Sequence, residues 1–364
     1  MWLLGKLTLA TMLVASQAAD INTQFWVEKA TGPVTRSGQS GDLGGSCAPY
    51  MDVLNDIYLE AIDMAEVALE ALNNYASNPV IRATLQTYMG IKPDGTEVSA
   101  AHTSQFNYIK GAYNKVVAFG NLHYGSDRLP AFFCDGGWRW KTTMEYVDGK
   151  QTGRTVSEAS GGRSSYMYYS PRFKTWAGVQ DGCGDSATLG FFLSKPRSIT
   201  ICPAAWTWKR RKDSLKPWRD GTRVMRDGRP FYNAYSLPGT FLHELIHLTS
   251  KSIITDKKVI VDGQEKPAYF PNNVAELAKS SVDDARLNAD SYAWFATAMY
   301  LPVMDWSREI AGTYTGSKIS SRMVGNITSY IPEENGLKRR SDFASPAVQN
   351  LEEYEDDVIT DYSL

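Results

Sequence analysis

Long apolar runs and a strong net charge are both absent from this sequence of 364 residues. The apolar stretch at residues 7–15 is too short to cross a bilayer, and no later segment is long enough. A formal net charge of −2 argues against a general nucleic-acid-binding protein. Histidine and cysteine are scarce, with four of each, and no Cys-x-x-Cys occurs, which argues against a zinc site built from cysteines. An apolar content of 43% is still ample for a core.

The first 18 residues have the features of a secretory signal peptide. Lys6 supplies the positive charge, residues 7–15 supply the short apolar segment, and Ser16-Gln17-Ala18 offers a small-residue cleavage site. We therefore expect a secreted, extracellular protein. In that oxidising compartment four cysteines fit two disulfides rather than buried free thiols. Their spacing alone leaves all three pairings open. The cysteines are Cys47, Cys134, Cys183 and Cys202.

The composition changes along the chain and predicts an α+β fold. Residues 19–45 are polar and become rich in glycine and serine, so we expect an extended arm or a short pro-segment. Residues 46–304 are expected to form one domain, with a helical part at 46–125 and a part that carries the sheet and the metal site at 126–304. Residues 305–364 are expected to form a C-terminal extension with an acidic tail.

Apolar periodicity gives the strongest local signal at residues 51–75, where the 3.6-residue period of a helix is sustained. Further helices are expected at 80–89, 104–119, 274–285 and 289–300, and short strands at 131–133, 143–147, 165–169 and 198–202. Two basic stretches have no assigned role. These are an insertion at 207–230 and Lys338-Arg339-Arg340, which is either a processing site or a solvated run of charge.

Residues 241–250 contain the motif His-Glu-x-x-His. On a helix, His243 and His247 are four residues apart and lie on one face, where two imidazoles can bind one Zn²⁺. Glu244 is then placed to act as a general base toward a water molecule. Leucine, isoleucine and phenylalanine fill the rest of the segment, and Ser236 or Thr240 can cap it. The alternative interpretation is a chance match on a buried helix.

A catalytic zinc site needs a third protein ligand, and no histidine follows His247. His102 and His123 lie far upstream and are expected on the surface or on helices. A carboxylate is therefore the expected ligand, and two candidates remain open. Asp256 lies in a short connection after the motif, and Glu276 lies on the next expected helix, as in a thermolysin-like site.

The motif, an aspartate nine residues after it and the segment Asn288-Ala289-Asp290-Ser291-Tyr292 together resemble the aspzincin metallopeptidases, the deuterolysins and fungal lysine-specific metalloendopeptidases. The resemblance extends from about Cys47 to Tyr300. It implies a zincin-like fold with an N-terminal helical part and Asp256 as the third ligand. It also implies a substrate-binding role for Asp290. The implied disulfides are Cys47–Cys134 and Cys183–Cys202.

Three departures from the family's sequence pattern bear on the site. Ile253 and Ile254 stand where the family has Gly-Thr, and Val259 stands where it has a tyrosine that helps to bind the oxyanion. Tyr269 is expected to take over that role from a longer loop. Ala293 replaces a glutamate of the lysine-specific branch, which argues against a strict lysine preference.

The sequence thus predicts a secreted, monomeric zinc endopeptidase that acts on proteins or peptides. His243, His247 and Asp256 would bind Zn²⁺, and Glu244 would act as the general base with help from Tyr269. The strand at 198–202 is expected at the edge of the cleft, where it would pair with an extended substrate. The alternative is a secreted binding or effector protein on a degenerate peptidase scaffold.

Overall fold

The computed structural model describes residues 20–29, 33–36, 39–42, 44–121, 129–177, 182–184, 188–207, 213–223, 228–301, 304–308, 312–313, 332–333 and 336–337. The expected signal peptide, His123, Lys338-Arg339-Arg340 and the acidic tail lie outside these residues, and so do residues 208–212 and 224–227 of the basic insertion. No helix within the described ranges has the length and apolarity needed to span a membrane.

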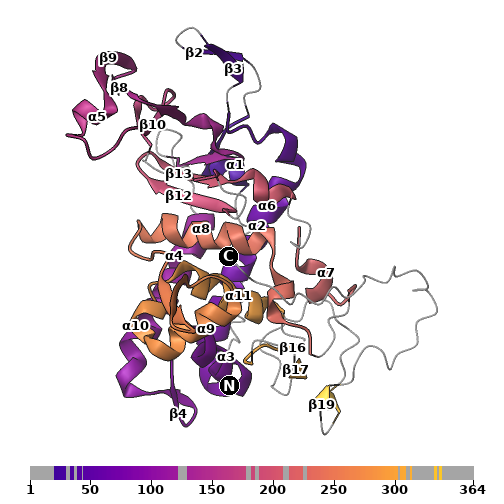
Figure 1. The fold of residues 1–364 in the computed structure, drawn as a ribbon. Helices are drawn as coiled ribbons and strands as arrows, with labels where there is room; N and C mark the ends of the chain where they lie inside the picture. The colour runs from indigo at the N-terminus through magenta and orange to yellow at the C-terminus, as the bar shows by residue number, and fades with distance from the viewer. Residues whose placement is uncertain are drawn as a thin grey trace, which may run out of the picture.

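Six helices of eleven or more residues build the lower part of the molecule (Figure 1). They are α2 (Met51–Asn73), α3 (Pro79–Met89), α4 (Thr103–Asn121), α8 (Leu237–Ser250), α9 (Phe270–Ser280) and α11 (Ala289–Tyr300). Shorter helices are α1 (Ile21–Gln24), α5 (Val156–Ala159), α6 (Pro203–Thr207), α7 (Lys216–Arg219) and α10 (Val282–Ala285). α8 runs between the sheet and the remaining helices and packs against α2, α4 and α11. The periodicity of the sequence therefore predicted the main helices correctly.

The expected helix at 274–285 is divided in the structure. α9 begins earlier, at Phe270, and ends at Ser280, after which Ser281 adopts an extended conformation. The Ser281 hydroxyl then accepts a hydrogen bond from the amide of Asp284 and caps α10. A serine at an N-cap satisfies a free amide of the next helix, so it starts a new helix rather than continuing the old one.

A four-stranded mixed sheet lies on the other side of α8 (Figure 1). Its order is β1 (Trp26–Val27), β6 (Ala131–Phe133), β13 (Arg197–Ile201) and β12 (Gly190–Ser194). β13 is parallel to β6 and antiparallel to β12. The strand expected at 198–202 is therefore interior, and the expectation that it forms the edge of the cleft is wrong. β12 is the terminal strand of this sheet and packs on α8.

The other strands form small sheets and hairpins away from α8. A three-stranded sheet contains β7 (Trp140–Thr142), β10 (Met167–Ser170) and β11 (Thr175–Trp176), next to the hairpin of β8 (Met144–Val147) and β9 (Lys150–Thr155). The remaining hairpins pair β2 (Pro33–Arg36) with β3 (Gln39–Asp42), β4 (Pro93–Asp94) with β5 (Glu97–Val98), β14 (Lys258–Val261) with β15 (Gln264–Pro267), β16 (Met304–Asp305) with β17 (Gly312–Thr313), and β18 (Pro332–Glu333) with β19 (Gly336–Leu337).

Aromatic packing holds α8 to the sheet. The Phe241 ring of α8 stacks on Phe132 of β6 with centroids 4.9 Å apart, and Phe25 meets both rings edge-on. Phe25 is buried directly before β1, and Ile21 and Val27 are buried beside it, so residues 20–29 pack onto the core through these side chains. Offset and edge-on aromatic pairs add to the free energy gained from burial of their area, which fixes the position of α8 beneath the sheet.

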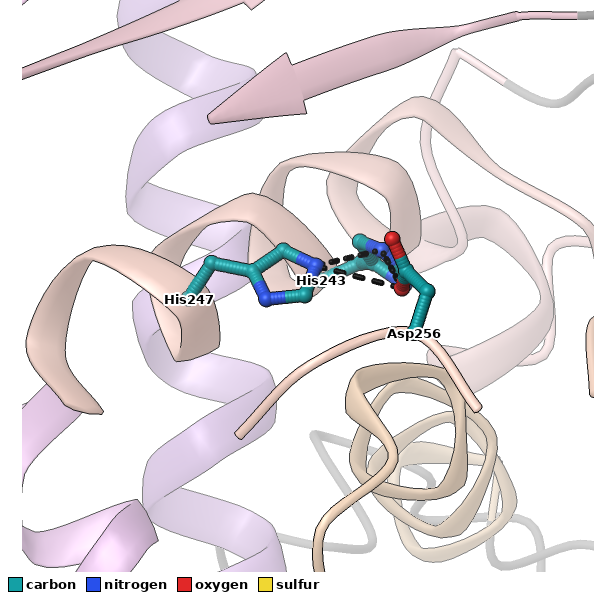
Figure 2. Close-up of side chains that lie close together, drawn as sticks. All are labelled: His243, His247 and Asp256. Atoms are coloured by element: carbon teal, nitrogen blue, oxygen red, sulfur yellow. Dashed lines mark hydrogen bonds and ion pairs between the residues drawn. The ribbon is translucent and has the colours of Figure 1, made fainter. Parts of the chain in front are cut away.

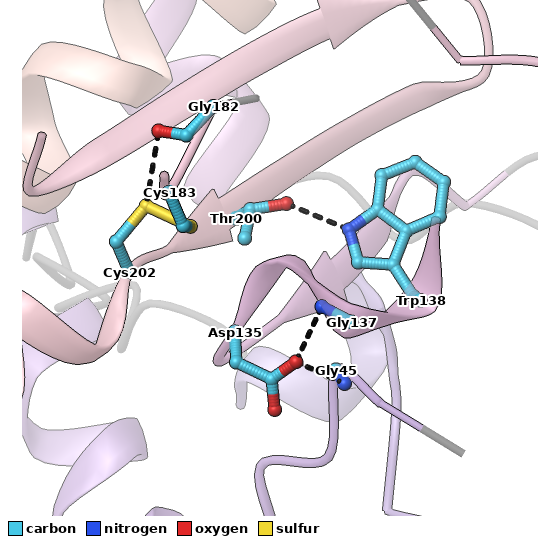
Figure 3. The surroundings of a disulfide bond; sticks show 8 residues. All are labelled: Gly45, Asp135, Gly137, Trp138, Gly182, Cys183, Thr200 and Cys202. Atoms are coloured by element: carbon cyan, nitrogen blue, oxygen red, sulfur yellow. Dashed lines mark hydrogen bonds between the residues drawn. A yellow bond between two sulfur atoms is a disulfide. The ribbon is translucent and has the colours of Figure 1, made fainter. Parts of the chain in front are cut away.

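Two disulfides join the sheet to its surroundings, and their pairing is the one that the resemblance implies. Cys47 is bonded to Cys134, which follows β6, and Cys183 is bonded to Cys202, which follows β13. Figure 3 shows the second bond beside β13, with the side chain of Asp135 accepting hydrogen bonds from the amides of Gly45 and Gly137, each 2.6 Å long. The described residues include no free cysteine.

We predict that the two disulfides stabilise the protein unequally. Cys47 and Cys134 are 87 residues apart, whereas Cys183 and Cys202 are 19 apart. Loop-closure entropy then gives roughly 4.6 and 3.2 kcal/mol, respectively. Replacing Cys47 and Cys134 together by alanine should therefore lower the free energy of unfolding in urea more than replacing Cys183 and Cys202. A larger loss of unfolding free energy from replacing Cys183 and Cys202 would contradict this prediction.

Candidate metal centre

α8 presents both histidines of the motif on one face. Ser236 caps the helix by accepting the Gly239 amide at 3.1 Å, and Pro238 occupies the first turn, where its missing amide costs nothing. From this start, the four-residue spacing brings the Nε2 atoms of His243 and His247 to 3.1 Å from each other. Figure 2 shows the two rings side by side above the loop that follows the helix.

The chain reverses direction directly after α8. Lys251 and Ser252 both adopt positive φ, at 55° and 63°, and the Ser252 amide donates to the His247 carbonyl at 3.1 Å. The Ser250 hydroxyl then accepts the Ile254 amide at 3.2 Å. Two consecutive non-glycine residues in the left-handed region are uncommon, and here they send the chain back beneath the helix.

This reversal delivers Asp256 to the histidines. Its Oδ1 atom lies 3.1 Å from His243 Nε2 and 3.2 Å from His247 Nε2 (Figure 2). Three ligand atoms therefore lie within contact distance of one another. Within the described ranges, these residues form the one group of histidine, cysteine and carboxylate side chains that could hold a metal ion.

Glu276, the other candidate ligand, is not at the site. It lies on the exposed side of α9, where its carboxylate forms an ion pair with Lys279 at 2.7 Å and its side chain is 47% exposed. A pair spaced three residues apart on a helix surface is an ordinary solvent-exposed interaction. Of the two carboxylates, Asp256 is therefore the one that the structure brings to the histidines.

Hydrogen bonds at Nδ1 of His243 and of His247 determine which nitrogen of each imidazole is free to bind a metal ion. His247 Nδ1 lies 2.9 Å from the carbonyl oxygen of Ile254, and His243 Nδ1 lies 2.9 Å from Asp290 Oδ1. Both partners only accept, so in the neutral form of each ring Nδ1 donates its proton and Nε2 presents a lone pair. Two imidazole lone pairs and a carboxylate oxygen facing one another repel unless a cation lies between them.

The pKa shifts of His243 and Asp256 also indicate that a positive charge is favoured between these side chains. Burial opposes a positive charge on His243, but the carboxylates of Asp256 and Asp290 outweigh it and raise the pKa of His243 well above its usual value. Burial also tends to raise the pKa of Asp256, yet the two imidazoles lower it below its usual value. The site therefore favours a positive charge at its centre, which a metal ion or a proton can supply.

Asp290 lies behind His243 on the first turn of α11. Its Oδ1 atom faces His243, and its Oδ2 atom accepts hydrogen bonds from the Phe270 amide at 2.8 Å and from Trp294 Nε1 at 3.1 Å. With both oxygens engaged, Asp290 orients His243. A contact of Asp290 with substrate, which the resemblance implied, stays a prediction.

Glu244 lies between α8 and the terminal strand of the sheet. Glu244 is 3% exposed, and its Oε2 atom has no hydrogen-bond partner in the described part of the chain. Burial raises its pKa to about 7, while the two imidazoles oppose that rise. A carboxyl group with this pKa gains and loses a proton readily near neutral pH.

Gly190, the first residue of β12, makes room for Glu244. A Cβ atom built on Gly190 would lie 2.8 Å from Glu244 Oε1, closer than real contacts allow. Two residues along, the Phe192 ring lies 6.5 Å from that of His247. Neither β12 nor Gly190 was expected from the sequence. The one available signal was a glycine directly before the apolar run Phe191-Phe192-Leu193.

Tyr269 stands beside the ligands, directly before α9. Its ring centroid is 6.1 Å from that of His243, and the residue is 36% exposed. Burial raises the pKa of Tyr269, and so do the carboxylates of Asp256, Asp290 and Glu244. The hydroxyl is therefore protonated at neutral pH, and its proton is directed to Asp256 at the rim of the site.

Searches against protein-family models, curated proteins and solved structures found no match to this chain.

We predict that Asp256 and Glu276 differ sharply in their effect on metal content. Asp256→Ala removes one of the three converging ligand atoms and should yield protein that is largely free of metal after dialysis. Glu276→Ala breaks an exposed ion pair and should retain its metal. Elemental analysis of both variants tests this, and metal retained by the Asp256 variant but lost from the Glu276 variant would contradict it.

Proposed function

We propose that this protein is a secreted zinc-dependent endopeptidase with a zincin-like fold. The observation that carries the proposal is the convergence of His243, His247 and Asp256 next to the buried, unpartnered Oε2 of Glu244. The two disulfides fit passage through an oxidising compartment. The resemblance of the zinc motif and the Asn288-Ala289-Asp290 segment to aspzincins supports the same function.

The ligand set suits Zn²⁺. Two imidazole nitrogens and one carboxylate oxygen form a set typical of catalytic zinc, with one position left for water or substrate. Tetrahedral bonds of about 2.0–2.1 Å separate neighbouring ligand atoms by about 3.3–3.4 Å. The observed separations of 3.1–3.2 Å between Nε2 of His243, Nε2 of His247 and Oδ1 of Asp256 are close to this spacing.

Each residue around the ligands has a chemical role in this proposal. A bound zinc ion supplies Lewis-acid polarisation of the scissile carbonyl and a more acidic water molecule. Glu244 accepts a proton from the attacking water and passes it to the leaving amine. The protonated Tyr269 hydroxyl donates a hydrogen bond to the oxygen on which negative charge develops.

β12 is the proposed docking edge for the substrate backbone. It ends the four-stranded sheet, and Gly190 at its start touches the general base. An extended peptide added to this edge would gain main-chain hydrogen bonds, and its scissile bond would lie alongside Glu244.

Cleavage of casein and of a peptide library, with and without chelator, tests the proposal. Glu244→Gln should keep the zinc and the fold but lower turnover by a factor on the order of 10²–10⁴, because the amide cannot accept the proton. Glu276→Gln, which changes an exposed glutamate in the same way, is the matched control and should retain activity. Activity near the wild-type value in the Glu244 variant would refute the mechanism. Zinc binding without any hydrolysis in the wild-type protein would favour the binding or effector protein instead.

A second prediction concerns the space beside Glu244. Gly190→Ala should displace the Glu244 carboxylate and lower kcat, by a factor that can reach ~10² for an ångström-scale misplacement. Zinc content should not change, because the three atoms nearest to the added Cβ all belong to Glu244. Gly111→Ala provides the control, since a Cβ atom there meets nothing within 4 Å. Equal activity of the two variants would show that the close contact with Glu244 has no catalytic consequence.

A further inference from the structure

Asn288 occupies the N-cap of α11, yet its side chain does not cap the helix. An asparagine at this position normally accepts a hydrogen bond from an amide of the first turn, and loss of such a cap costs about 1 kcal/mol. Asn78 shows the ordinary arrangement at the start of α3, where its Oδ1 accepts the Val80 amide at 2.9 Å. The side chain of Asn288 is directed elsewhere, although the residue is completely buried.

The partners of Asn288 lie on both arms of the loop that carries the third ligand. Its Oδ1 atom accepts the amide of Lys257, the residue after Asp256, at 3.0 Å. Its Nδ2 atom donates to the carbonyl of Ala268, the residue before Tyr269, at 3.0 Å. A second Nδ2 contact, at 3.2 Å, joins it to Ser291 Oγ on its own helix. One buried amide thus connects the outgoing and returning strands of the loop at its base.

The backbone next to Asn288 holds the same loop. The Thr255 amide donates to the Leu287 carbonyl at 2.9 Å, and the Ala289 amide donates to the Thr255 carbonyl at 3.0 Å, which forms a parallel bridge. Asp256 is therefore fixed by its two neighbours, since Thr255 and Lys257 are both bonded to the start of α11. The Asp256 side chain itself is 40% exposed and cannot rely on packing for its position.

We propose that Asn288 is a positioning residue that holds the Asp256 loop in place and thereby determines the affinity of the metal centre. The inference deepens the proposed function, because it assumes that His243, His247 and Asp256 bind a metal. Without Asn288, the two histidines keep their orientation, since Asp290 and Ile254 hold their Nδ1 atoms. Asp256 loses the hydrogen bond that holds the following residue, Lys257, and keeps only the backbone bridge at Thr255 on its other side, so its position is less well defined. Groups that orient ligands typically contribute 10–100-fold to metal affinity.

The test is Zn²⁺ affinity, measured on the purified full-length protein by competition with a chromogenic chelator. Asn288→Ala should weaken binding by about 10–100-fold. Asn78→Ala is the matched control: it also removes a buried N-cap asparagine, but far from the site, so it should destabilise the fold and leave the Zn²⁺ affinity unchanged. The absorption spectrum of the Co²⁺-loaded Asn288 variant should differ from that of the wild type, which a purely structural role would not produce.

Two results would overturn the inference. One is wild-type Zn²⁺ affinity in Asn288→Ala, and the other is an equal loss of affinity in Asn78→Ala. Asn288→Asp gives a second variant for the case in which the alanine variant does not fold. It keeps the acceptor for the Lys257 amide but turns a carboxylate oxygen toward the Ala268 carbonyl, so weaker binding is expected, and unchanged affinity overturns the inference. A wild-type protein that binds Zn²⁺ but cleaves no peptide would refute only the peptidase. A wild-type protein that binds no Zn²⁺ would overturn both.

Discussion

The repulsion between three electron-rich atoms that face one another is the constraint that explains the arrangement of the surrounding residues. Nε2 of His243, Nε2 of His247 and Oδ1 of Asp256 lie 3.1–3.2 Å apart, and each ring donates its other proton away from the centre. Such an arrangement is unfavourable without a positive charge at its centre. A protein that keeps it must hold the three side chains from outside, and the surrounding hydrogen bonds provide that support.

Much of the outside support comes from the start of α11. Asp290 orients His243 and also accepts the Phe270 amide, while Asn288 joins Lys257 to Ala268. Two side chains two positions apart thus hold one histidine, the loop that carries Asp256 and the start of α9. Rigid helices position functional side chains more accurately than loops do, and here a helix helps to position Asp256, which lies on a loop.

The opposite side of the site is formed by the sheet. The aromatic contact of Phe241 with Phe132 fixes α8 beneath β6, and the antiparallel pairing of β12 with β13 then places Gly190 against Glu244. Glu244 is therefore buried because a strand, rather than solvent, lies next to it, and its Oε2 has no hydrogen-bond partner among the described residues. The burial that raises its pKa to about 7 follows from this sheet order.

The sequence by itself determined the features that depend on neighbouring residues. The helix at 51–75 and the zinc-motif helix follow from apolar periodicity and capping, and the four-residue spacing puts His243 and His247 on one face. The resemblance implied both disulfides, which the structure contains. Tertiary structure decided the features that depend on distant residues. Asp256 and Glu276 are equivalent as carboxylates, so residue type alone does not choose between them. The turn that brings Asp256 to the histidines has positive φ at Lys251 and Ser252, and without a glycine there the sequence does not predict it.

The order of strands in the sheet and the hydrogen bonds that support the site could likewise not be predicted from the sequence. The segment at 198–202 has the apolar character of either an edge or an interior strand. Its interior place depends on pairing with β6, which lies far earlier in the chain, in addition to its hairpin partner β12. Gly190 acts through its close approach to Glu244, 54 positions later in the chain. Asn288 acts through its hydrogen bond with Lys257, 31 positions earlier. Local periodicity reports which face of an element is apolar, whereas only the packed chain decides which distant groups meet there.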